Sequence, residues 1–430
     1  MALFSCFLCY YLCLLPLLSY GIIHHMNILA IESSCDETAA AIISGDPFSD
    51  TKNPNVQNSN FQIAKPQILS NVVVSQIDIF KAYGGVIPEV AARSHLEAIL
   101  PVIHEAFEKA NFKTDDKDDW SKIDAIAVTH TPGLLGSLLI GTLTARTLAI
   151  LHNKPLYAVH HLKSHIYANW LETEKTPSFP LLSLVISGGH TQIIRMTDHN
   201  NFEIIGTTLD DAVGECFDKV AKILGLPYPG GPAIAKAAKS GDPNKYKLPH
   251  PQIKNLDFSF SGLKTAVLRA VQKEVGVPIS YPSHELAKLL TPKQVADFAA
   301  SFENTACDIL IEKLKKALTL YPDTKSIVIA GGVSANQTLR KKIKLSFGGT
   351  NPIPSNSATS IPDERASAPA YDVPEFDGVT TKDNFVFFPG IKFSGDNAAM
   401  VGAACFYEIK KGVKPTDPFK LNILPRSAIN

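Results

Sequence analysis

The segment 123–151, with the sequence IDAIAVTHTPGLLGSLLIGTLTARTLAIL, contains the pattern that decides the fold. Ile123–Thr129 is a short apolar run of the kind that forms a buried strand. It leads into His130-Thr131-Pro132-Gly133 and then into a long apolar stretch, Leu134–Leu151, which we expect to be a helix. A strand, a glycine turn and a helix N-terminus in this order suit the binding of an anion. The segment therefore predicts an α/β unit with a ligand-binding turn.

Two further apolar runs end in a pair of glycines. Leu181–Ile186 runs into Ser187-Gly188-Gly189-His190, and Ser326–Ala330 runs into Gly331-Gly332-Val333-Ser334-Ala335-Asn336 before another helix. Strands that alternate with helices are typical of α/β folds. Because one such turn lies in each half of the chain, we expect two α/β lobes. Upstream, Pro88–Ala110 has helical periodicity; its apolar face consists of Leu96, Ile99, Leu100 and Ile103.

Two segments fall outside this pattern. Residues 1–26 include an apolar run that is almost free of charge, and this run is either a leader or membrane anchor, or the product of a start placed too early, with Met26 as the true first residue. Residues 346–383 are rich in Pro, Ser, Asn, Thr and Gly without steady periodicity, which indicates a flexible insertion.

The composition excludes several classes of protein. The chain has 430 residues, 45% of them hydrophobic, and a formal net charge of zero. A protein that coats nucleic acid without specificity usually has a strong basic excess, so any contact with RNA here needs a local basic patch or a partner. Four of the seven cysteines lie outside the apolar leader and are far apart, and no CxxC pair occurs among them. A disulfide framework and a cysteine zinc site are therefore not expected, and a reducing compartment fits better.

The sharpest local signal is a histidine pair in His160-His161-Leu162-Lys163-Ser164-His165. His161 and His165 are four residues apart, so on a helix they lie on one face and can share a metal ion. The alternative is a pair of ordinary surface or core histidines. Asp396, in a glycine turn before a helix, is a candidate third ligand, although an N-cap is the simpler interpretation of that position. A zinc peptidase is excluded because Leu162 stands where the catalytic Glu would be needed.

Glycine turns and acidic turns supply further candidates. The turns 187–190 and 331–336, together with Tyr228-Pro229-Gly230-Gly231-Pro232, let backbone N–H groups approach a phosphate or a sugar. In the acidic stretch 210–219, Asp218 is the better candidate for gripping ribose hydroxyls, the alternative being a charged first helical turn. A second acidic turn contains Glu32, Asp36 and Glu37, and it either orients a reacting group or is a solvated hairpin turn.

Taken together, these segments resemble one family, the tRNA N6-adenosine threonylcarbamoyltransferases, formerly called O-sialoglycoprotein endopeptidases. The matching stretches follow the order of the family and cover most of the chain after the leader. They are residues 31–38, 84–89, 131–134, 160–165, 187–191, 210–219, 228–231, 258–264, 331–336 and 396–397. The form Glu-Ser-Ser-Cys-Asp-Glu-Thr at 32–38 resembles the bacterial and mitochondrial branch.

The resemblance implies an actin-like, sugar-kinase-like (ASKHA) fold, with two α/β lobes and the active site in the cleft between them. On this basis we expect residues 27–155 and 396–430 to form the first lobe. Residues 156–395 would then form the second lobe and would contain the flexible insertion.

The resemblance also implies the site. His161, His165 and Asp396 would hold one divalent metal ion, iron or zinc. The pocket for threonylcarbamoyl-adenylate would be lined by Val185, Ile186, Ser187, Gly188, Gly189, Asp218, Gly231, Ala335, Asn336 and Gly395. The chain departs from the family pattern at Lys163, where Glu or Gln is usual, and at Ser164, where Gly or Ala is usual; neither is a metal ligand.

The implied reaction transfers the threonylcarbamoyl group of L-threonylcarbamoyladenylate to N6 of adenosine 37 in tRNAs that read ANN codons, with release of AMP. Because the exocyclic amine is a poor nucleophile, we expect a nearby base, with Asp36 and Glu37 as candidates. The implied partners are tRNA, a second copy of the chain in a homodimer, and functionally the synthase that makes the adenylate. We expect a location in the mitochondrial matrix and no stable membrane role.

Two other functions remain open from the sequence. An ATP-dependent kinase of the same fold usually opens with an Asp-x-Gly-x-Thr phosphate turn, but residues 32–36 are Glu-Ser-Ser-Cys-Asp here. A non-catalytic scaffold would have no need of the ligand set His161, His165 and Asp396.

Overall fold

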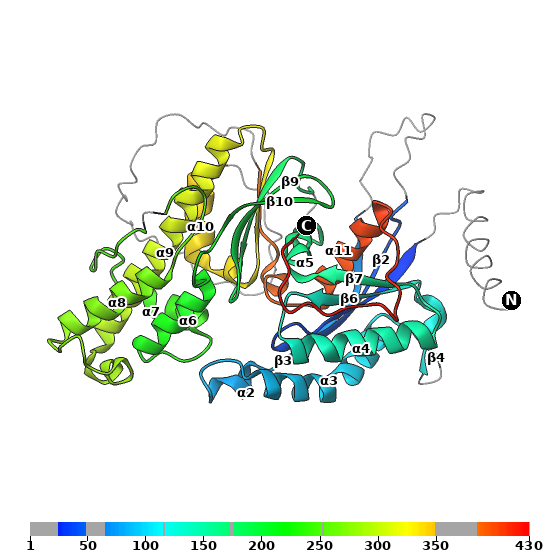
Figure 1. Ribbon diagram of the computed structural model, residues 1–430, viewed down its shortest axis with the longest axis horizontal. Coiled ribbons are helices and arrows are strands. Elements are labelled where there is room, and N and C mark those ends of the chain that lie inside the picture. The colour runs from blue at the N-terminus through cyan, green and yellow to red at the C-terminus, as the bar shows by residue number, and fades with distance from the viewer. Residues whose placement is uncertain are drawn as a thin grey trace, which may run out of the picture.

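The computed structural model describes residues 25–48, 65–114, 117–172, 175–251, 253–348 and 385–429. Nearly all of the predicted leader and of the predicted insertion lie outside the described residues. The described chain forms two α/β lobes that lie side by side (Figure 1). Among the described residues, no helix combines the length and the apolar character that crossing a membrane requires. The cysteines of this part, Cys35, Cys216, Cys307 and Cys405, are free thiols, as expected.

The first lobe is built on a five-stranded sheet in the order β3-β2-β1-β6-β7. Its strands are β1 (Met26–Glu32), β2 (Glu37–Gly45), β3 (Gln67–Ser75), β6 (Ala125–Thr131) and β7 (Leu156–His160). The pairs β1–β2 and β2–β3 are antiparallel, whereas β1–β6 and β6–β7 are parallel. Helices α3 (Pro88–Lys109) and α4 (Leu135–Leu151) cover one face and α11 (Ala398–Lys410) covers the other, which explains why the central strands are apolar throughout (Figure 1).

The second lobe repeats this plan with the order β10-β9-β8-β11-β12. Here β8–β9 and β9–β10 are antiparallel, and β8–β11 and β11–β12 are parallel. The strands are β8 (Leu181–Ile186), β9 (Thr191–Asp198), β10 (Asn201–Thr207), β11 (Ser326–Ala330) and β12 (Phe385–Phe387). The helices of this lobe are α6 (Val213–Ile223), α7 (Gly230–Ala238), α8 (Ser261–Glu274), α9 (Pro292–Leu320) and α10 (Gln337–Phe347). Two lobes with the same strand pattern confirm the predicted fold class.

Short elements complete the described chain. Helix α5 (His161–Tyr167) directly follows β7 and contacts α11 of the first lobe as well as β8 and β11 of the second, so it lies where the lobes meet. The remaining elements are α2 (Ile77–Lys81), β4 (Lys113–Thr114), β5 (Lys117–Asp118), η2 (Trp120–Lys122), η3 (Ala168–Trp170), η4 (Ser283–Leu289), η5 (Gly332–Ala335) and η6 (Ile391–Phe393).

Two sequence-based expectations about the first lobe need correction. The predicted lobe boundary between residues 155 and 156 is one strand too early, because β7 pairs with β6 in the first sheet. The predicted apolar face of α3 is also only half right. Ile99 and Ile103 are buried, but Leu96 and Leu100 are 64% and 61% exposed. The helix turns His95, Ile99, Val102, Ile103 and Ala106 toward the sheet instead, and so leaves two leucines on the outer surface.

The close packing of α11 on the first sheet gives a testable prediction. A Cβ added at Gly402 would lie 2.4 Å from Ile43 Cγ1 and 3.3 Å from Ala30 Cβ. We expect Gly402→Ala to lower the free energy of unfolding by about 1–3 kcal/mol through overpacking, measured by thermal or denaturant unfolding. Gly262→Ala is the matched control because a Cβ there meets no atom within 4 Å. Equal stability of the two variants would contradict this account.

Candidate active site

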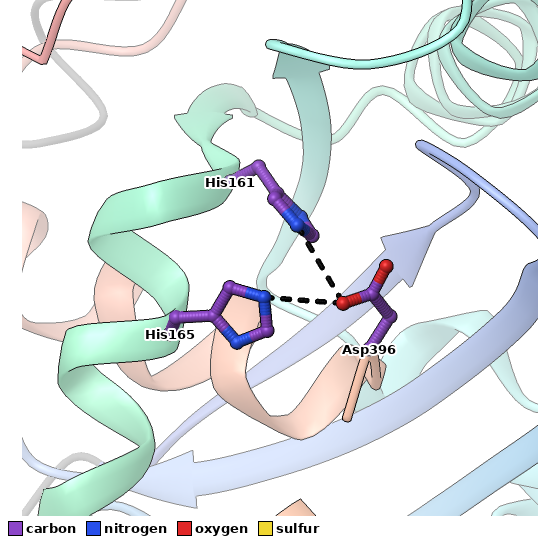
Figure 2. A group of neighbouring side chains, drawn as sticks. All are labelled: His161, His165 and Asp396. Carbon is purple, nitrogen blue, oxygen red and sulfur yellow. Dashed lines mark ion pairs between the residues drawn. The ribbon is translucent and has the colours of Figure 1, made fainter. Parts of the chain in front are cut away.

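The predicted metal ligands come together where the lobes meet. His161 and His165 project from one face of α5, and Asp396 approaches them from the turn before α11 (Figure 2). Asp396 Oδ1 lies 3.5 Å from His161 Nε2 and 3.1 Å from His165 Nε2. One ligand atom from each residue lies within 4.8 Å of the others. The structure therefore assembles a compact set of two imidazoles and one carboxylate from distant parts of the chain.

The N-cap of α11 is Asn397 and not Asp396. The Asn397 side chain caps α11 by accepting a hydrogen bond from the Met400 N–H at 3.0 Å. Asp396 is therefore not the N-cap that its sequence position suggested, and its carboxylate is available to face the histidines. Zinc and iron both accept imidazole and carboxylate ligands, and they are the two metals that the family resemblance implies.

The state of His165 supports a metal site. Its ring is buried, and neither ring nitrogen makes a hydrogen bond in the described structure. Its Nε2 is close to Asp396 Oδ1 but too poorly aligned for a hydrogen bond. A buried imidazole usually has a hydrogen-bond partner, and a bound divalent ion would satisfy this one. The donor set therefore fits the expected metal.

The orientation of His161 depends on Glu32, a residue that the sequence analysis did not place at the metal. The buried Glu32 carboxylate accepts hydrogen bonds from Ser34 N at 2.6 Å and Thr129 Oγ1 at 2.6 Å, and lies 3.2 Å from His161 Nδ1. An ionised carboxylate can only accept, so Nδ1 carries the proton of this contact and Nε2 faces Asp396. The signal in the sequence that could have identified Glu32 was its position at the end of the first strand.

The charged groups around the triad shift one another's pKa values. Burial alone would lower the pKa of His161, but Asp396 and Glu32 together raise it to about 9. Burial would raise the pKa of Asp396, yet the two histidines hold it below its usual range. Binding of a cation to the histidines must therefore displace a proton from His161, which makes metal affinity increase with pH.

The acidic turn after β1 borders the same site. Its Cys35 carbonyl is held by His95 Nε2 at 3.0 Å and by Ser137 Oγ at 3.1 Å, while His95 Nδ1 pairs with Thr38 Oγ1 at 2.8 Å. These contacts fix the backbone that carries Asp36 and Glu37, the predicted catalytic residues. Burial raises the pKa of Glu37 well above its usual value, and the negative charges of Asp396 and Asp36 raise it further. A solvated hairpin turn is therefore the wrong interpretation of this segment.

The predicted anion-binding turn before α4 has a different role. Gly133 N donates to Pro425 O at 3.1 Å, and Leu134 N donates to Ser34 O at 2.8 Å. A Cβ on Gly133 would lie 2.5 Å from Ser34 O, so glycine is required for this close approach. These two amides already have partners and are not available to an anion, and the glycine turn forms a wall beside the acidic turn.

The predicted substrate residues lie mainly on turns of the second lobe. Val185 and Ile186 are buried at the end of β8, and the turn 187–190 is closed by the hydrogen bond from Ser187 N to His190 O. The Cα atoms of four glycines face open space, since a Cβ there would meet no atom within 4 Å: Gly188, Gly189, Gly231 and Gly395. These glycines therefore leave room for a ligand to approach the backbone.

Asp218 and Asn336, two further predicted substrate residues, already make hydrogen bonds within the protein. Asp218 accepts from Gly230 N at 2.7 Å, and burial raises the pKa of its carboxyl, with a further contribution from Asp36. Asn336 follows Ala335, the last residue of η5; its side chain caps α10 and donates to Glu303 Oε1 at 2.7 Å. One oxygen of Asp218 thus fixes the glycine turn at α7, while Asn336 fixes the start of α10.

The triad gives a prediction about metal content. We expect His165→Ala to lose the divalent ion, and Glu32→Gln to lower metal affinity by about 10- to 100-fold because it disturbs the group that orients His161. The measurement is metal content by mass spectrometry, together with a competition titration against a chelator.

His104→Ala is the control, since His104 is an exposed histidine on α3 that pairs with Asp118. Unchanged metal content in His165→Ala would show that the triad is not the metal site.

The comparisons with known proteins concern the family and the fold of the chain. A family model described as TsaD, tRNA N6-adenosine threonylcarbamoyltransferase, matches residues 67–356. Among solved structures, the crystal structure of HypF from T. kodakarensis has a similar fold, with a TM-score of 0.51 and 13% sequence identity. That match covers 91% of this chain and 50% of HypF, and it supports the two-lobed fold alone.

Curated relatives match over nearly their full length. A tRNA N6-adenosine threonylcarbamoyltransferase from Symbiobacterium thermophilum is 41% identical over 399 residues, which cover 93% of this chain and 95% of the relative. The protein with the same name from Bacillus subtilis is 40% identical over 391 residues, covering 90% and 92%. The chain therefore belongs to the tRNA N6-adenosine threonylcarbamoyltransferase family.

Proposed function

We propose that the cleft around His161, His165 and Asp396 transfers the threonylcarbamoyl group of L-threonylcarbamoyladenylate to N6 of adenosine 37 in tRNAs that read ANN codons. The observation that carries this proposal is the triad of two buried histidines and a half-buried aspartate beside the acidic turn, in a chain whose relatives are named for this transfer. The kinase alternative receives no support from these relatives.

The residues of the site would mainly position the reactants. His161, His165 and Asp396 would hold a divalent ion, which would supply Lewis acidity. Glu32 keeps the Nε2 atom of His161 directed toward Asp396 by holding its Nδ1 proton. Since AMP is a good leaving group, correct placement of the carbamoyl carbon against the acceptor amine accounts for much of the required rate enhancement.

Backbone amides of the open glycine turns at 188–189 and 231 would receive the adenylate and stabilise the negative charge on AMP as it leaves. Asp218 supports this arrangement by holding Gly230 N. Its second carboxylate oxygen remains available for a ribose hydroxyl.

Glu37 is our candidate for the base that accepts a proton from N6. Burial and the neighbouring negative charge of Asp36 raise the pKa of Glu37, and a carboxylate with a raised pKa is a stronger base than an ordinary one. The target adenosine lies in a loop, so its base can leave the stack and enter the cleft.

We also propose that the active form is a homodimer. Helices α3 and α4 contact each other and expose large apolar side chains on their outer surface, namely Leu96, Leu100, Leu135, Leu139 and Leu143. Exposed apolar groups on neighbouring helices are typical of an interface.

We expect Leu96→Glu/Leu100→Glu to convert a dimer to a monomer, as measured by light scattering after gel filtration. Leu345→Glu, at an exposed leucine on α10, is the control. A monomeric wild type would contradict the homodimer.

Two further aspects concern the cellular setting. The mixed anhydride must come from a separate synthase that makes threonylcarbamoyl-adenylate. We place the reaction in the mitochondrial matrix, on the strength of the organellar form of residues 32–38 and the N-terminal apolar segment. Imaging of the full chain fused to a fluorescent protein tests this location, and a signal outside mitochondria would contradict it.

The decisive experiment is an adenosine-modification assay. The full chain and His161→Ala/His165→Ala are supplied with threonylcarbamoyl-adenylate and an unmodified tRNA transcript, and nucleosides are analysed by mass spectrometry. We expect modification by the wild type and a loss of at least about 100-fold in the variant. His104→Ala controls for the histidine substitutions. Equal activity of the double variant would remove the triad from the mechanism, and an inactive wild type would revive the scaffold alternative.

A further inference from the structure

We propose that the C-terminal segment 422–429 forms one wall of the subsite that receives the acceptor tRNA, and that the Arg426 guanidinium contacts a phosphate of the anticodon loop there. This inference rests on the function proposed above and extends it to a residue outside the metal and adenylate sites.

The segment is fixed to the first lobe beside the active site. Leu424 N donates to His130 O at 3.2 Å, Thr131 Oγ1 donates to Leu424 O at 2.6 Å, and Gly133 N donates to Pro425 O at 3.1 Å. Ile429 is buried in the core cluster that contains residues of α5 and α11. These contacts hold the backbone on both sides of Arg426, so the guanidinium is attached to an ordered wall.

This wall borders a cavity that both lobes share. The cavity has a volume of about 590 Å³, which is the size of a small-molecule site. It is lined by Pro132, Gly133, Gly189, His190, Pro425, Arg426, Ser427 and Ala428. In Figure 1 the C-terminus lies between the two lobes, in agreement with this position. The cavity therefore continues from the glycine turn 187–190 toward the first lobe.

The cavity is next to the metal ligands. Gly133, which lines the cavity, packs against the backbone of Ser34, and Ser34 Oγ lies 3.2 Å from Nδ1 of the metal ligand His161. Of the residues assigned to the adenylate, the cavity is lined by Gly189, whereas Asp218 and Gly231 do not line it. The acceptor nucleoside must approach the carbamoyl carbon from elsewhere, and the cavity provides such an approach.

The positive charge of Arg426 explains why an RNA phosphate fits this position. The acidic side chains of Glu32, Asp36, Glu37 and Asp396 gather around the site, and the chain as a whole has no net positive charge to attract RNA. Arg426 is exposed and is the permanent cation among the residues that line the cavity. Its planar guanidinium matches the geometry of phosphate oxygens and can donate two hydrogen bonds to them.

The test uses the full chain with Arg426→Ala, Arg426→Lys and the control Lys420→Ala. Lys420 is an exposed cation that lies earlier on the same C-terminal stretch and does not line the cavity. We expect Arg426→Ala to raise KM for tRNA by about tenfold, the effect of losing one charged hydrogen-bonding group, with KM for the adenylate and kcat unchanged.

A second readout does not depend on catalysis. Binding of a tRNA transcript is followed by fluorescence anisotropy as a function of salt concentration. Loss of one phosphate contact should lower the steepness of log Kd against log salt by about 0.7 in Arg426→Ala, and Arg426→Lys, which keeps the charge, should restore it. Thermal unfolding of each variant checks that the fold is intact.

Several results would overturn the inference: an unchanged salt dependence in Arg426→Ala, an equal effect of Lys420→Ala, or a rise in KM for the adenylate in place of tRNA. Failure of the proposed function is distinguished from these results, because it would appear as an inactive wild type whose binding of tRNA can still be measured.

Discussion

The arrangement of the active site depends on one buried carboxylate. Glu32 accepts hydrogen bonds from the backbone of its own turn and from Thr129 on β6, and it lies against the His161 ring on α5. A buried charge without partners would be costly, and the contacts with His161 and Thr129 lower the pKa of Glu32 against the effect of burial. The same contacts connect the first sheet to the helix that carries both histidines. The stability of the lobe and the orientation of the metal ligand thus depend on the same group.

The duplication of the lobes explains where the site lies. Each sheet has two antiparallel strands on one side of its first strand and two parallel strands on the other. Helix α5 follows β7 of the first sheet and packs against the second sheet. The turn before α11 comes after the last strand of the second sheet and reaches the same place from there. Side chains from both lobes and from the C-terminal segment therefore surround one cleft. Relative movement of the lobes would change the shape of that cleft.

Much of this could be predicted from the sequence. The alternation of apolar runs and glycine turns indicated two α/β lobes, and the spacing of His161 and His165 indicated a shared ligand face. Other features depend on tertiary contacts that local patterns do not contain. Periodicity did not reveal that α3 turns His95 inward and Leu96 outward, and the cap at Asn397 became evident only from its bond to Met400. The C-terminal segment has no motif, so its contact with the turn before α4 could not be predicted.

The separation of the metal ligands along the chain affects when the site can form during folding. His161 and His165 lie close together in the sequence, whereas Asp396 follows only after the strands and helices of the second lobe. Two imidazoles without the carboxylate form an incomplete ligand set, and Glu32 and Thr129 must already be paired across the first sheet to orient one of them. A divalent ion would therefore be held stably only after Asp396 has folded against the histidines, which would make metal acquisition a late step in the maturation of the protein.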